Sequence, residues 1–170
     1  MKFFSKAFHI VSLAVLAMLV FLLPGCLGEE ECDETTANLL RIGFYTRVPV
    51  TGLIQPILID SISVYGVSRA SSLIYDNSKR IRTIELPLKP MADSTGFVLI
   101  FPTNITDTIW VRHTYQLQFV SPACGFTVFN TLDEVNHTSR VIESVSIVQN
   151  FVSNTLEEHI KLFVNLNPDD

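Results

Sequence analysis

Three cysteines are the side chains of this sequence whose chemistry and spacing are most informative. They stand at positions 26, 32 and 124. A thiol can accept a lipid, join a second thiol in a disulfide, or bind a metal ion as its thiolate. Cys26 and Cys32 enclose a short acidic segment directly after an apolar run, whereas Cys124 stands alone in the second half of the chain. Their neighbours indicate which chemistry each thiol performs.

The start of the chain has the pattern of a signal peptide. Lys2 and Lys6 come before an apolar stretch from Ala7 to Leu23, and Pro24 and Gly25 then end that stretch. A helix that spans a membrane needs about 20 apolar residues, which is more than this stretch provides. Removal of residues 1–25 is therefore favoured over a retained transmembrane anchor.

The residues Leu23-Pro24-Gly25-Cys26 resemble a bacterial lipobox. The resemblance implies that the thiol of Cys26 receives diacylglycerol, and that cleavage before Cys26 then frees an amine for acylation. Gly25 is the small residue that such a cut requires, while Pro24 is atypical. We expect Cys26 to attach the protein to a membrane through lipid, the alternative being a chance Gly-Cys pair at the end of an ordinary signal peptide.

Acidic residues crowd the segment that follows Cys26, namely Glu29, Glu30, Glu31, Asp33 and Glu34. Carboxylates are repelled by anionic lipid, so residues 26–37 are expected to form a solvated tether and not a docking patch. The segment also resembles the acidic export signals of Bacteroidota surface lipoproteins. That resemblance implies an outer-membrane location and favours the outer face over the periplasmic face.

The two remaining cysteines predict a disulfide. If Cys26 carries lipid, Cys32 and Cys124 both lie outside the cytoplasm, where disulfides persist. Their pairing would close a loop of about 90 residues. Two cysteines without nearby histidines make a poor zinc site, and the CxxC spacing of a redox pair is absent. Two free thiols are the alternative.

Residue patterns for catalysis are weak. His113, His137 and His159 are far apart and fit none of the usual zinc-binding spacings, and neither GxSxG nor a glycine-rich phosphate loop is present. We expect His113 at a bulge, His137 in a polar loop and His159 near a helix end. The sequence therefore predicts no catalytic residue, no metal and no cofactor. The chain is not expected to be an enzyme, with an unrecognised hydrolase as the remaining alternative.

The charge of the chain argues against nucleic acid as a partner. The net charge is −5 and becomes −7 without the first 25 residues, because these hold two lysines and no acid. Nucleic-acid-binding domains carry a basic patch or stripe, and none is present here.

The body of the chain alternates between apolar and polar residues. Leu40, Ile42 and Phe44 share one face of a predicted strand, and the long segment from Asp107 to Val120 repeats the pattern. Frequent turn signals separate such segments. We predict an all-β domain over residues 38–165, an antiparallel β-sandwich of the immunoglobulin-like kind, with an open barrel second. A short C-terminal helix at 150–159 and a frayed tail at 166–170 complete the prediction.

Several segments together resemble a known family. They are LLRIGFYT, IDSISVYGV, IELPLKPMADSTGFVLIF, DTIWVRHTY and FVSPACGFTVFNTL. The family consists of small Bacteroidota lipoproteins that are catalogued only as a domain of unknown function, and the likeness runs from Cys32 to about Val164. The resemblance implies a secreted, lipid-anchored, mostly β protein and assigns no activity.

Two kinds of function fit these expectations. The first is a structural or accessory subunit of an envelope complex, with another envelope protein as its partner. The second is a surface module that binds carbohydrate or peptide. For the second, Trp110 is the candidate binding residue because it alternates with the inward Ile109 and Val111, and an outward aromatic ring suits stacking.

Overall fold

A computed structural model describes residues 32, 37–48 and 50–166 of this chain. The chain divides into two units, residues 1–33 and residues 34–170, and every element below belongs to the second unit. The predicted signal peptide (1–25), most of the predicted tether and all but the first residue of the predicted tail lie outside the described residues. Among the described residues, no helix has the length and apolar character needed to cross a membrane.

The described residues form eleven strands and one turn of 3₁₀ helix. In chain order they are β1 (Leu39–Arg47), β2 (Ile54–Pro56), β3 (Ile59–Gly66), β4 (Leu73–Ile81), β5 (Thr83–Pro87), β6 (Ser94–Ile100), η1 (Pro102–Asn104), β7 (Thr106–Ser121), β8 (Gly125–His137), β9 (Ile142–Ile147), β10 (Phe151–Val152) and β11 (Ile160–Val164).

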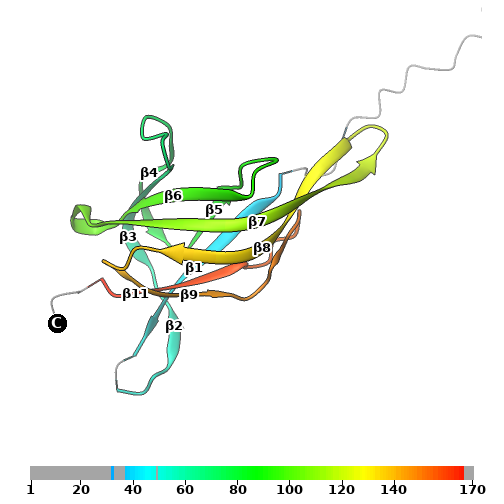
Figure 1. Ribbon diagram of the computed structural model, residues 1–170. Coiled ribbons are helices and arrows are strands. Elements are labelled where there is room, and N and C mark those ends of the chain that lie inside the picture. The colour runs from blue at the N-terminus through cyan, green and yellow to red at the C-terminus, as the bar shows by residue number, and fades with distance from the viewer. Residues whose placement is uncertain (1–31, 33–36, 49, 167–170) are drawn as a thin grey trace, which may run out of the picture. The chain divides into compact units, whose positions relative to one another are not determined.

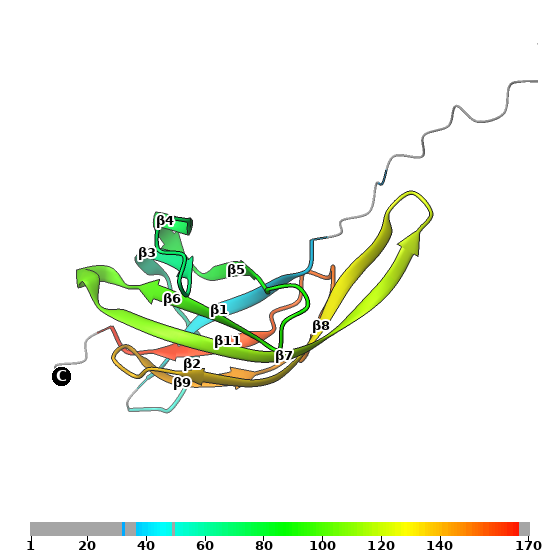
Figure 2. The same cartoon turned by 45° about the horizontal axis from the view of Figure 1, so that its top comes forward.

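The strands form two sheets that pack face to face (Figures 1 and 2). One sheet has the order β2-β1-β11-β9, with β5 paired to the first half of β1. The other has the order β10-β8-β7-β6-β3-β4. The pairings are antiparallel except that of β1 with β11, which is parallel. The predicted all-β sandwich is confirmed.

The immunoglobulin-like order of strands is not found. In that fold, strands A, B, E and D face strands C, F and G, so neighbouring strands in the sequence often lie in opposite sheets. Here β6, β7 and β8 follow one another as a meander within one sheet. Each is joined to the next by a short turn, and short turns keep successive strands antiparallel and adjacent.

The expected helix at residues 150–159 is wrong. Phe151 and Val152 form β10 and pair with Thr131 and Asn130 of β8. Leu156 is 78% exposed. A short helix is stabilised mainly by burying an apolar face, and with Leu156 in solvent this segment has too little to bury. Pairing with β8 buries Val152 completely.

Alternate residues from both sheets fill the core. Those that are at most 1% exposed include Leu40, Ile42, Phe44, Phe97, Leu99, Ile109, Val111, Ile160 and Leu162. The ring of Phe44 meets that of Phe101 edge-on, with centroids 6.3 Å apart. Each such side chain contributes about 1.5–3 kcal/mol relative to an exposed one, so the period-two pattern is what fixes the inner face of each strand.

One carboxylate lies within this core. Asp107, in β7, is completely buried. Its Oδ1 accepts hydrogen bonds from the hydroxyl of Thr138 at 2.5 Å and the amide of Arg140 at 3.0 Å. Its Oδ2 accepts from the amides of Val141 at 2.7 Å and Ile142 at 2.9 Å. Burial by itself raises the pKa of Asp107, but these four hydrogen bonds outweigh it and hold the pKa below its ordinary value.

Replacement of this carboxylate tests its structural role. We expect Asp107→Asn to lower the free energy of unfolding by about 2–3 kcal/mol, because an amide NH₂ would face backbone N–H groups that lose their acceptor. Denaturant titration measures the loss. The control is Asp60→Asn, which removes the same charge from an exposed position.

The stabilisation that Asp107 provides is expected to decrease as the pH falls. Because the folded pKa of Asp107 is depressed, its stabilisation is fully present above the unfolded pKa of about 3.9 and is lost as pH falls through the folded pKa. The free energy of unfolding of Asp107→Asn should therefore change less over this acidic pH range than that of the wild type. Equal changes in the two proteins would contradict the assigned role.

Candidate functional site

The second half of β7 and the first half of β8 form a long hairpin that leaves the sandwich. The pairing of β7 with β6 stops at Arg112, and from Thr114 onward β7 pairs with β8 alone. Figures 1 and 2 both show this two-stranded ribbon running beyond the other strands. No residue from Thr114 to Leu132 carries a charge. The hairpin is therefore an uncharged projection from the domain.

One face of this hairpin is apolar and exposed. We call it the hairpin face; it consists of Tyr115, Leu117, Phe119, Phe126 and Val128. Tyr115, Leu117, Phe119 and Phe126 are 42–67% exposed. The rings of Phe119 and Phe126 meet edge-on with centroids 5.4 Å apart. A contiguous apolar patch of this kind on a protein surface marks an interaction site.

The hairpin face continues the core side of β7. Ile109, Val111 and His113 point inward and are completely buried, and the alternation carries on through Tyr115, Leu117 and Phe119. The pattern of residues does not change along the strand. What changes is that the opposite sheet ends, so the same side of β7 becomes exposed.

A groove lies along the β8 arm of the hairpin. Its volume is about 320 Å³, and it is lined by Asn38, Leu88, Pro90, Phe126, Thr127, Val128 and Asn130. The side-chain amide of Asn38 donates to Thr127 Oγ1 at 3.0 Å and to the carbonyl of Val128 at 2.7 Å. These bonds attach the residue before β1 to the hairpin, so the groove is held on both sides.

The turn of the hairpin carries a cysteine. Cys124 lies directly before Gly125, and its amide donates to Ser121 Oγ at 3.1 Å. Gly125 has a φ of +68°, a conformation that favours glycine. Cys32 and Cys124 are both disulfide-bonded, which confirms the predicted pair. Cys26, the predicted site of lipidation, lies outside the described residues.

Trp110 points out of the sandwich, as expected from its alternation with buried neighbours. It is 45% exposed, while Ile109 and Val111 are completely buried. Its ring lies against the backbone of Gly96, where an added Cβ would come within 2.6 Å of two ring carbons. One side of the ring therefore rests on β6 and the other remains available.

The first buried histidine lies in β7 at a bulge, as the sequence predicts. The register of β7 with β8 shifts between Arg112 and His113. His113 is completely buried, and its Nε2 lies 2.9 Å from Thr95 Oγ1. Burial lowers its pKa and outweighs the opposing effects of the Asn130 side chain and of the charges of Asp133 and Asp93. His113 is therefore a neutral structural group.

The second buried histidine departs from the prediction. His159 was expected near a helix end, but it immediately precedes β11 and is completely buried. The amide of Arg41 donates to its Nδ1 at 2.9 Å. Burial lowers the pKa of His159. The charge of Glu157 and the backbone of Phe151 oppose this shift, and the charge of Arg41 adds to it. The ring is held neutral beside β1.

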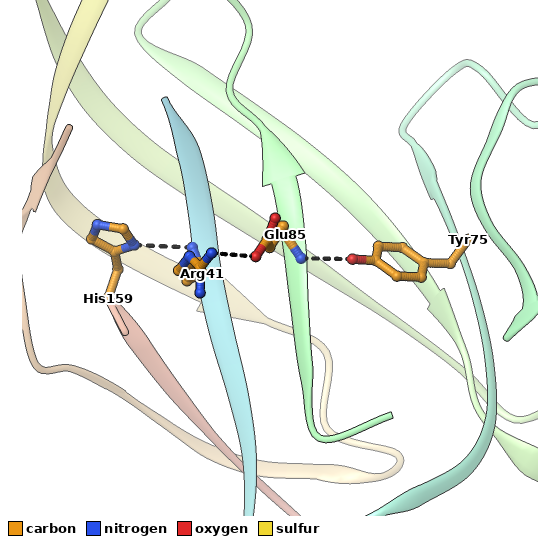
Figure 3. A network of polar contacts seen from close by, with 4 residues as sticks. All are labelled: Arg41, Tyr75, Glu85 and His159. Atoms are coloured by element: carbon orange, nitrogen blue, oxygen red, sulfur yellow. Dashed lines mark hydrogen bonds and ion pairs between the residues drawn. The ribbon is translucent and has the colours of Figure 1, made fainter. Parts of the chain in front are cut away.

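His159 is one end of a polar network that runs from the residue before β11 across β1 and β5 to β4 (Figure 3). The guanidinium of Arg41 lies 2.5 Å from the carboxylate of Glu85 in β5. The amide of Glu85 in turn donates to the hydroxyl of Tyr75 at 2.9 Å. Because β5 and β4 belong to different sheets, this last bond joins the two layers of the sandwich.

These positions separate the candidate residues instead of gathering them. Trp110 lies on the outer side of one sheet, whereas His113 is buried within β7 and His159 is buried just before β11. His137 is the last residue of β8 and not part of a loop. Within residues 32, 37–48 and 50–166, no group of three or more histidine, cysteine, aspartate or glutamate side chains could hold a metal ion.

The hairpin face is the feature that the sequence analysis missed. Its alternation was visible from Tyr115 to Phe119, but period two is the same for a half-buried strand and for a projecting one. The absence of charge from Thr114 to Leu132 is the signal that could have drawn attention to it.

The disulfide should contribute strongly to stability. We expect Cys32→Ala and Cys124→Ala each to lower the melting temperature, because a loop of about 90 residues gives ~4–5 kcal/mol in the chain-entropy model. Calorimetry of the single and double variants measures this, and the double variant should be no less stable than either single one. Reductant should remove the difference from wild type. Alkylation of two thiols in unreduced wild-type protein would contradict the bond.

Comparison with known proteins identifies a family to which no activity is assigned. No curated protein and no solved structure is significantly similar to the chain. Residues 61–164, which run from β3 to the end of β11 and include the hairpin and Trp110, match a family described as a family of unknown function (DUF6452). The match covers more than half of the sequence and confirms the expected uncharacterised domain. The chain therefore belongs to this family of unknown function.

Proposed function

We propose that this protein is a bacterial lipoprotein of the cell envelope, acylated at Cys26, that acts without catalysis as a structural or accessory subunit of an envelope complex. The observation that carries the proposal is the disulfide of Cys32 and Cys124. Disulfides persist in oxidising compartments outside the cytoplasm. The signal pattern and Leu23-Pro24-Gly25-Cys26 supply the route of export and the site of acylation.

The accessory role is supported by the burial and the bonding of the ionisable groups inside the domain. Asp107, His113 and His159 are completely buried, and each is engaged with neighbouring backbone or side-chain groups. General acids and bases must reach a substrate, and these three side chains hold strands together instead. The exposed features are apolar or aromatic, which suits contact with another surface.

The proposed location is the outer membrane, with display on the outer face. The acidic residues Glu29, Glu30 and Glu31 follow the acylated cysteine closely, as in the export signals that they resemble. Their charge also keeps the tether in water.

Acylation is tested by Cys26→Ser. We expect this variant to remain uncut and to incorporate no labelled fatty acid, because the hydroxyl of serine does not replace the thiol that accepts the lipid. The matched control is Cys32→Ser, which should be acylated normally. Added protease should degrade the wild type on intact cells if the protein is displayed. Normal labelling of Cys26→Ser would overturn the proposal, and protection from protease would move the protein to the periplasmic face.

A second candidate function is favoured by Trp110. A half-exposed indole that rests on a glycine offers one free face, and such faces stack on sugars and on peptide side chains. A glycan and peptide array probed with wild type and with Trp110→Ala tests this reading. We expect a binding module to lose about two- to tenfold in affinity, since a stacking contact is worth roughly 0.5–1.5 kcal/mol. Equal binding by both proteins would exclude Trp110 as a binding residue.

A further inference from the structure

We propose that the hairpin face rests on the surface of the lipid bilayer that holds the acylated Cys26. This inference depends on the proposed lipoprotein function and adds to it a second point of membrane contact. It assigns a partner, the interfacial region of a bilayer, to the hairpin face, of which Tyr115, Leu117, Phe119 and Phe126 are exposed.

Chain connectivity limits how far the hairpin can be from the membrane. Cys32 follows Cys26 by six positions, and an extended residue spans at most about 3.6 Å. The disulfide then places the Cα of Cys124 within about 7 Å of that of Cys32. The covalent path from the acylated residue to the turn of the hairpin is therefore six residues and one disulfide, about 30 Å when fully extended. Of the described strands, β7 and β8 are those joined by this turn.

The composition of the hairpin suits a bilayer interface. Residues 114–132 carry no charge, so bringing them close to lipid desolvates no ion. The hairpin face presents Phe and Leu side chains, with Tyr115 nearer the sandwich, and aromatic side chains are enriched where membrane meets water. Gln116 and Gln118 are exposed on the opposite side of the ribbon. Their partners on β8 are already covered, because Phe129 packs against Phe151 and Thr127 is bonded to Asn38.

The contact would be hydrophobic and not electrostatic. The tether is acidic and the hairpin is neutral, so anionic lipid does not attract either. The acyl chains supply the main attachment, and a single apolar patch adds to it by lying about 5–10 Å into the headgroup boundary. The hairpin would thereby orient the sandwich relative to the membrane as well as hold it there.

Depth-sensitive fluorescence tests the inference on the acylated full-length mature protein. The chain has one tryptophan, Trp110, which lies on the sandwich and serves as the reporter away from the membrane. Trp110→Phe combined with Phe119→Trp moves the single tryptophan to the hairpin face. Trp110→Phe combined with Gln116→Trp places it on the opposite side of the same ribbon. Each protein is reconstituted into phosphatidylcholine vesicles with and without brominated acyl chains.

We expect bromolipid to reduce the tryptophan emission of the Phe119→Trp protein about twofold, as for a side chain about 5–10 Å into the interface. The emission of Trp110 in the wild type should stay nearly unchanged. The Gln116→Trp protein should be quenched much less than the Phe119→Trp protein. Leu117→Trp in the same background should be quenched like position 119, which keeps the test decisive if Phe119→Trp does not fold. The quenching should persist in high salt.

The outcomes separate this inference from the proposed function. The first outcome is that the variants carry acyl chains and float with the vesicles but show no quenching at positions 119 and 117. This result would overturn the membrane contact and would not affect the proposed lipoprotein function. The hairpin face would then be assigned to a protein partner. Equal quenching at positions 116 and 119 would also overturn it. Protein without acyl chains that does not float would overturn the proposed function itself.

Discussion

The carboxylate of Asp107 is the interaction on which the sandwich depends. Between β8 and β9 the chain passes from one sheet to the other, and at that point the backbone amides of residues 140–142 all donate to one carboxylate. Asp107 accepts all three from within β7. Because the charge is fully hydrogen-bonded, its burial is tolerated, and the crossover is fixed against the central strand of the larger sheet.

The alternating residue pattern of β7 continues through two different environments. Over its first half, the inward residues pack against the opposite sheet, while over its second half the same side of the strand is exposed. An isolated two-stranded ribbon is only marginally stable in water. The edge-on pair of Phe119 and Phe126, the bonds from Asn38 and the disulfide at the turn each restrain this one. Hydrogen bonds along its β8 arm and a covalent restraint at its tip make the hairpin a defined surface.

The sequence was sufficient for the class of fold and for the cysteine pair. Alternation over Leu40, Ile42 and Phe44 identifies strands because burial of one face imposes period two. Alternation does not say which strands pair, so the meander of β6, β7 and β8 and the parallel pair of β1 and β11 were not foreseen. The roles of His159 and Asp107 were also hidden, because each depends on a contact with a residue far away in the sequence.

The pairing of the first long strand with the last one has a consequence for how the chain folds. Ile42 pairs with Ile160, and Arg41 bonds to a residue 118 positions further on. The strand β11 also pairs with β9, so one sheet cannot assemble until the C-terminal residues have arrived. Contacts this distant in sequence slow folding, because a long loop must be closed before any of them forms.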